Sequence, residues 1–165
     1  MALGDNTLQA ARGNSQRGRN PYLVQTELNM ATALSDKGSA LAASDVIPVI
    51  SVDKGTMILN AGIEVIEATS AGTSTCDLGV TGIDADAFVD GFNSASGTAA
   101  GTLSQNPAAY QPIMCVADDT IDLLLATQSG TAMTTGKLRI WAVLMDCTNM
   151  GGDMTANEVA RDALA

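Results

Sequence analysis

Apolar and polar residues alternate in the middle of the chain. Between residues 57 and 65 every odd position is apolar, and Asn60, Gly62 and Glu64 stand between them. A period of two is typical of a strand with one face buried and one face solvated. Ile66 breaks the alternation, which indicates a β-bulge or the end of the strand. The pattern predicts a half-buried strand that ends near residue 66.

Other short segments rich in Val, Ile, Leu and Thr also read as strands, and Gly, Ser, Thr or Asp separates them. They are residues 22–28, 46–52, 73–80, 113–118, 120–126 and 138–147. Pro48 indicates an edge strand or a strand start, because proline donates no backbone hydrogen bond. The last segment is apolar on both sides, which predicts burial of both faces, by a second sheet or by a neighbouring subunit. Short strands without a long periodic helix predict an all-β fold, a jelly-roll-like antiparallel β-sandwich.

The sequence divides into three parts. Residues 1–30 form an extended N-terminal arm, of which the first twenty or so are rich in Gly, Asn and Arg and offer little to bury. Residues 31–150 form the sandwich, in which residues 29–44 fit either a short helix or a loop. Residues 151–165 form a tail with a short C-terminal helix, because Thr155 and Glu158 have the spacing of a capping box.

Composition narrows the possible functions. The net charge is −10, which argues against nucleic acid as a partner because phosphate binding needs a positive surface. No segment resembles a signal peptide, and no apolar run reaches the length of about 18 residues that spans a membrane. Cys76, Cys115 and Cys147 are widely spaced, which fits reduced, buried thiols in a protein made in a cytoplasm.

Candidate chemistry is sparse. The chain has no His, so Ser-His and Cys-His nucleophile pairs and His-containing metal sites are excluded. Asp84, Asp86 and Asp90 could bind calcium, but a loop with Asx turns explains the same residues and is favoured. A glycosidase would need a cleft with aromatic platforms, and aromatic residues are only 3% of the chain. We therefore expect no enzyme activity, no cofactor and no metal.

Several stretches carry a family resemblance. They are residues 61–73, 77–79, 84–91, 119–123 and 135–143. Together they resemble small virion structural proteins of tailed bacteriophages, particularly marine and cyanobacterial phages. Related phage cement proteins are jelly rolls that bind the outside of the capsid as dimers or trimers. The resemblance therefore implies a head decoration or cement protein on the outer capsid surface, with the major capsid protein and further copies of itself as partners.

The arm and the tail supply the predicted contacts with those partners, although solvated tails explain the same residues equally well. The predicted interface residues are Arg12, Arg17, Arg19, Tyr22, Val159 and Leu164. Two other virion roles stay open, a tail, neck or fibre-base module and a carbohydrate-binding jelly roll for host attachment. A glycan binder would place aromatic side chains on exposed loops, and here Phe88 and Phe92 lie near the acidic loop and Tyr110 lies near a turn.

Overall fold

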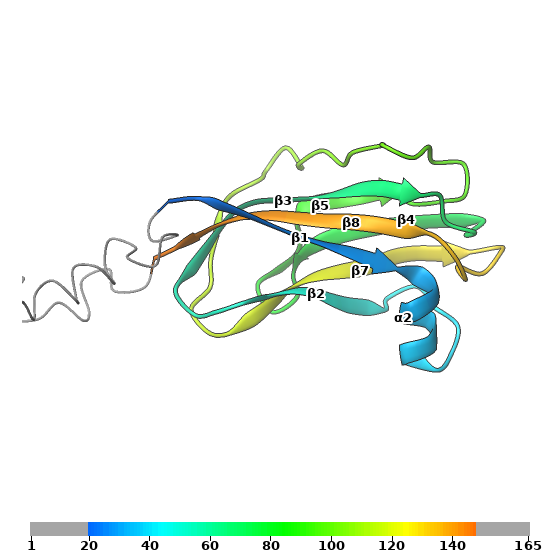
Figure 1. The fold of residues 1–165 in the computed structure, drawn as a ribbon, viewed down its shortest axis with the longest axis horizontal. Helices are drawn as coiled ribbons and strands as arrows, with labels where there is room; N and C mark the ends of the chain where they lie inside the picture. Colours follow the sequence, from blue (N-terminus) through cyan, green and yellow to red (C-terminus); the bar gives the residue numbers. More distant parts are fainter. Residues whose placement is uncertain (1–19, 148–165) are drawn as a thin grey trace, which may run out of the picture.

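The computed structural model describes residues 20–147, which form two stacked four-stranded sheets and one short helix (Figure 1). The elements are β1 (Tyr22–Asn29), α2 (Met30–Lys37), β2 (Val46–Val52), β3 (Thr56–Glu67), β4 (Thr73–Val80), β5 (Asp84–Asn93), β6 (Ile113–Met114), β7 (Asp119–Ser129) and β8 (Lys137–Asp146). The strand orders are β1-β8-β3-β6 and β2-β7-β4-β5, and every neighbouring pair is antiparallel. The all-β, antiparallel fold is as predicted.

Both ends of the described chain lie at one end of the sandwich, and α2 lies at the other (Figure 1). The reason is the pairing of the first strand with the last, because β1 runs antiparallel to β8 from Tyr22 opposite Leu144 to Asn29 opposite Lys137. The strand predicted for residues 22–28 is confirmed. This strand falls inside residues 1–30, which were predicted to form an arm. Residues 1–19 and the predicted C-terminal helix lie outside the described residues.

The core between the sheets is built mainly from aliphatic side chains. In β8, Leu138, Ile140, Ala142 and Leu144 are buried, while the residues between them are half-buried. Within the single chain the outer face of β8 is only half covered, so its burial by a neighbouring subunit stays a prediction. On this outer face Trp141 lies against Gly62. A Cβ atom added at position 62 would lie 2.5 Å from the indole ring.

Bulges set the phase of β3. The register against β8 shifts between Ile58 and Asn60, so that Ile58 is fully buried and Leu59 is not. Strict alternation had placed Leu59 on the buried face. A second shift lies between Val65 and Glu67, which confirms the irregularity predicted at Ile66.

The ambiguous stretch after β1 contains the helix α2. Asn29 is its N-cap, since its side-chain oxygen accepts a hydrogen bond of 2.9 Å from the backbone N–H of Ala31. Gly38 ends the helix in the left-handed region, at φ +69°, and donates its N–H to the Leu34 carbonyl. Both caps fit this eight-residue helix, which is too short to be stable without packing.

Residues 84–91 were predicted to form a loop, and this is wrong because they belong to β5. The register between β4 and β5 jumps from Leu78 opposite Val89 to Val80 opposite Asp84, so extra residues bulge out of β5. The backbone of β5 passes close over Gly79, where only a glycine leaves room. The segment 113–118 is shorter than predicted, with only Ile113–Met114 in a strand.

Candidate interaction surfaces

Of the six predicted interface residues, only Tyr22 lies in the described part of the chain. Its side chain is half-buried at the start of β1 and packs against the hydrophobic core. Arg12, Arg17, Arg19, Val159 and Leu164 lie outside the described residues, so their role stays a prediction. The two ends of the described chain, from which the N-terminal and C-terminal segments continue, lie at the same end of the sandwich (Figure 1).

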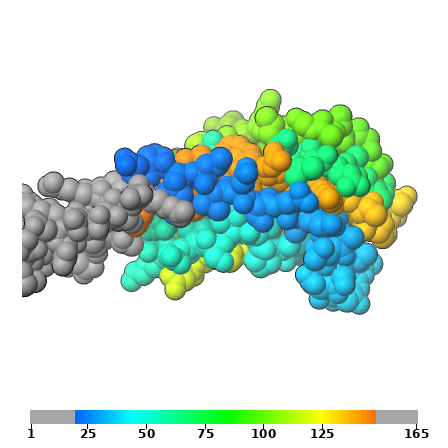
Figure 2. Space-filling model, viewed as in Figure 1, coloured from blue at the N-terminus to red at the C-terminus, as the bar shows by residue number. Residues whose placement is uncertain are grey.

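One long side of the sandwich carries two edge strands, β1 from one sheet and β2 from the other. Figure 2 shows β1 running along the surface above β2, with α2 projecting from one end. Within residues 20–147 neither strand has a second pairing partner. Leu23 on β1 is 61% exposed. In β2, Pro48 and the adjacent bulge make the edge unfavourable for pairing, as predicted for an edge strand.

A groove lies where these two edges meet α2, with a volume of about 520 Å³. The end of β1, one side of α2, the following loop and the start of β2 line it. Its apolar wall includes Leu28, Ala33, Leu41, Val46 and Ile47. No sequence pattern indicates this groove, because its walls come from three elements whose contact depends on the tertiary fold.

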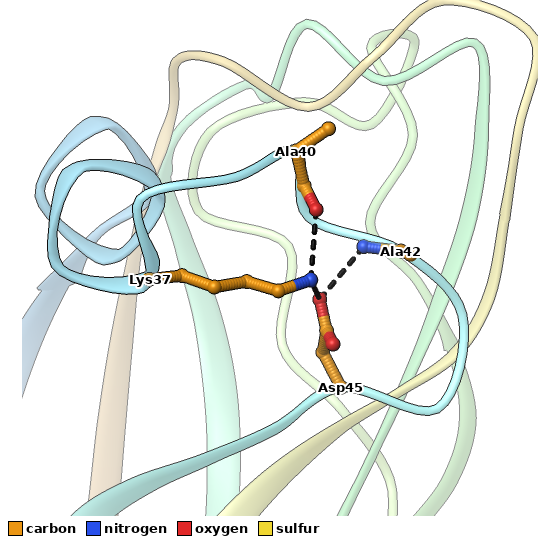
Figure 3. Close-up of polar contacts among 4 residues, drawn as sticks. All are labelled: Lys37, Ala40, Ala42 and Asp45. Atoms are coloured by element: carbon orange, nitrogen blue, oxygen red, sulfur yellow. Dashed lines mark hydrogen bonds and ion pairs between the residues drawn. The ribbon is translucent and has the colours of Figure 1, made fainter.

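An ion pair holds the loop that closes the groove (Figure 3). The Lys37 ammonium donates to the Asp45 carboxylate and, at 2.8 Å, to the Ala40 carbonyl. The same Asp45 oxygen accepts the backbone N–H of Ala42 at 2.8 Å. These hydrogen bonds lower the pKa of Asp45, and the one from Lys37 has the largest effect. Asp45 therefore stays charged at neutral pH and fixes the loop against α2.

The opposite long side carries exposed apolar side chains. Val116 is 75% exposed, and Ile83 and Met114 are also exposed. Ile83, Ala87 and Met114 line a second hollow of about 410 Å³ between the β4–β5 turn and β6. Exposed apolar groups gathered beside a hollow are typical of protein contact surfaces.

The acidic cluster of β5 is exposed. Asp84, Asp86 and Asp90 all face solvent, and a hydrogen bond with Asp84, together with its negative charge, raises the pKa of Asp86. Across residues 20–147 no three His, Cys, Asp or Glu side chains are grouped so as to hold a metal ion. One Asx contact is present, from the Asp86 N–H to the Asp84 carboxylate at 3.4 Å, although the segment is a strand.

Two other carboxylates are buried and fully used by the fold. Asp122 is 5% exposed and accepts the hydroxyl hydrogens of Thr81 and Thr120, both at 2.6 Å. Asp77 accepts the backbone N–H of Gly91 at 2.7 Å, where Gly91 adopts φ +67° in a bulge. These carboxylates stabilise the β4–β5 turn and the β5 bulge, because each satisfies donors that would otherwise be unpaired.

The three cysteines are buried free thiols, as predicted. Cys76 donates to the Ser94 hydroxyl at 3.1 Å, and Ser94 donates to Ser74 at 2.8 Å. Burial raises the pKa of Cys76 from 9.0 to about 11, because the core disfavours a thiolate. Burial also raises the pKa of Cys115. These properties are those of packing residues and not of nucleophiles.

The aromatic residues do not form a sugar-binding platform. Phe88 is fully buried, and its ring lies 6.1 Å from that of Tyr110 in a tilted arrangement. Phe92 is half-buried and packs against the core. The loop predicted beside Phe88 and Phe92 is strand β5, whereas Tyr110 follows a turn as predicted, with its side chain half-buried. In the part of the chain that the structure covers, no helix is long and apolar enough to cross a membrane.

Comparison with known proteins finds the same fold in phage capsids. A chain of the Ralstonia phage GP4 capsid superposes with a TM-score of 0.55 at 16% identity, covering 79% of this chain and 86% of that one. A chain of the cyanophage Pam1 capsid asymmetric unit gives 0.54 at 14% identity, covering 76% and 84%. No family model matches the sequence, and no curated protein matches it. At these identities the likeness is one of fold.

Proposed function

We propose that this chain is a structural virion protein of a tailed phage, a decoration or cement subunit that binds the outer surface of the major capsid lattice. The observation that carries the proposal is the likeness to chains of two phage capsids, which extends over more than four fifths of each of those chains. A match of that extent involves the whole domain and not one shared motif. The sequence resemblance to virion proteins of tailed phages points the same way.

The fold fits a jelly roll. Eight antiparallel strands divide into the orders β1-β8-β3-β6 and β2-β7-β4-β5, so that the chain crosses repeatedly between two facing sheets. Two four-stranded sheets connected in this way are the expected arrangement for a jelly roll, an architecture that viral capsid domains use. In this interpretation the edge strands β1, β2, β5 and β6 border the two long sides of the subunit.

The described surface offers contact groups rather than a reactive centre. The buried carboxylates Asp77 and Asp122 are used in hydrogen bonds that hold the fold, and the Cys76 thiol is protonated at neutral pH. Exposed apolar side chains such as Ile83 and Val116 lie near the edges of the sheets. A stable interface buries roughly 1,600 Å² in total, and repetition over a lattice makes modest contacts collectively strong.

A reconstitution experiment tests this function. Heads assembled by the encoding phage without this gene product are mixed with purified full-length chain and sedimented. We expect saturable co-sedimentation and greater resistance of the heads to heat or chemical disruption. If the chain stays in the supernatant when mixed with heads but sediments with isolated tails, it is a tail component and the decoration role is contradicted.

A further inference from the structure

The groove between β1, α2 and β2 is bordered by negative charge. Glu27, Asp36, Lys37 and Asp45 lie along it, three acidic groups and one basic group, which gives a net charge of −2. Lys37 is already paired with Asp45. Glu27 has only a longer contact of 3.5 Å with Lys137, in which the Glu27 side chain is 52% exposed and that of Lys137 38%. A segment that binds here should therefore carry apolar residues for the wall and positive charge for the rim.

The charges of the chain are distributed so that one terminal segment meets this requirement. Residues 20–147 hold four basic and fourteen acidic residues, a net charge of −10. Residues 1–19 hold Arg12, Arg17 and Arg19 against Asp5, a net charge of +2, together with Leu3 and Leu8. Residues 148–165 hold one basic and three acidic residues, a net charge of −2. Charge complementarity therefore selects the N-terminal segment over the C-terminal one.

The position of the groove favours a segment from another copy. The described chain begins at the end of the sandwich opposite α2 (Figure 1). To fill its own groove, the segment would have to reverse and run back along β1, about 25 Å for eight residues at the rise of a strand. Nineteen residues extend up to about 60 Å, which is enough to reach a neighbouring subunit without that reversal.

We propose that residues 1–19 of one copy bind in the groove between β1, α2 and β2 of a second copy. Leu8 or Leu3 contacts the apolar wall of Leu28, Ala33 and Ile47, and the arginines face the acidic rim at Asp36. This self-association goes beyond the capsid role and does not depend on it, since it follows from the chain alone. Failure to bind heads and failure to self-associate are separate results.

Cross-linking of mixed full-length chains tests the proposal directly. A photoreactive amino acid replaces Thr32, which lies exposed on the groove wall. Equal amounts of isotope-labelled and unlabelled chain are mixed and irradiated, and cross-linked peptides are identified by mass. We expect links from position 32 to residues 1–19, about half of them joining a labelled to an unlabelled chain. Links confined to one label, links only to other segments, or no links would each overturn the proposal.

A pair of charge variants gives a second, quantitative test by sedimentation. Arg12, Arg17 and Arg19 are replaced together by Gln, and we expect the self-association to weaken roughly tenfold at physiological salt, as expected for three exposed ion pairs. Asp36→Lys should weaken it severalfold in the wild-type chain and have no effect in the triple variant, because the two changes remove the same contact. Equal effects of Asp36→Lys in both backgrounds would contradict the proposal.

The matched control is Asp90→Lys, which makes the same charge change at an exposed residue of β5, away from the groove. We expect its self-association constant to stay within about twofold of wild type, since contacts beyond roughly 8 Å are screened at physiological salt. If Asp90→Lys weakens the association as much as Asp36→Lys does, the attraction is to the acidic body as a whole and the groove assignment is wrong.

Discussion

Gly79 is the position where the structure predicts the largest effect of the smallest change. An added Cβ atom would lie 2.1 Å from the carbonyl oxygen of Asp84 and 2.5 Å from the carbonyl carbon of Ala85. Both contacts are with backbone atoms, which cannot rotate away as a flexible side chain can. Gly79→Ala must therefore displace β5 from β4, and overpacking of this kind costs about 3 kcal/mol. For a domain of this size, that corresponds to a melting temperature lower by roughly 10 °C.

The matched control is Gly97→Ala. Gly97 lies in an exposed turn, has no positive φ, and an added Cβ would meet nothing within 4 Å. Its free energy of unfolding should stay within about 0.5 kcal/mol of wild type. Urea unfolding of the three proteins, followed by circular dichroism, measures both differences. If Gly79→Ala unfolds at the same urea concentration as Gly97→Ala, β5 does not pass over Gly79 as described, and the packing of this sheet edge is wrong.

Two further predictions concern buried polar groups. Because the pKa of Cys76 is about 11 in the fold and 9.0 as a free thiol, the folded state holds its proton more tightly over that range, so stability should fall by about 2 kcal/mol between pH 9 and 11. Urea unfolding of Cys76→Ala should not show this loss of stability with pH. An equal loss in the two proteins would refute the prediction. Asp122→Ala should cost about 3 kcal/mol, because Thr81 and Thr120 lose a charged acceptor. The exposed Asp90→Ala should change calorimetric stability by no more than about 0.5 kcal/mol, and equal losses would show that burial of Asp122 is not the cause.

The strands were predictable where one rule governs the pattern. The segments 46–52 and 73–80 coincide with β2 and β4, because β-branched runs between turn residues read directly as strands. Pro48 indicated an edge strand or a strand start because it lacks a backbone donor, and β2 is an edge strand. The irregularity at Ile66 was also visible, since a bulge interrupts the alternation of side chains.

The errors arise where the tertiary fold overrides local sequence. The aspartates of β5 suggested a loop, but an exposed edge strand can keep carboxylates in water while Phe88 and Val89 pack inward. The shift near Leu59 inverts the phase of one end of β3 without any Gly or Pro to mark it. The groove beside α2 had no signal, because Leu28, Leu41 and Ile47 come together only once β1 and β2 lie side by side.

The decoration role is tested most directly by imaging intact particles of the encoding phage and measuring the copy number of this chain against the major capsid protein. A decoration role predicts density of the size of this sandwich, repeated over the outer capsid surface, and copies in the hundreds. Density confined to the neck or tail, with a dozen copies or fewer, would contradict it, as would particles that lack the chain altogether.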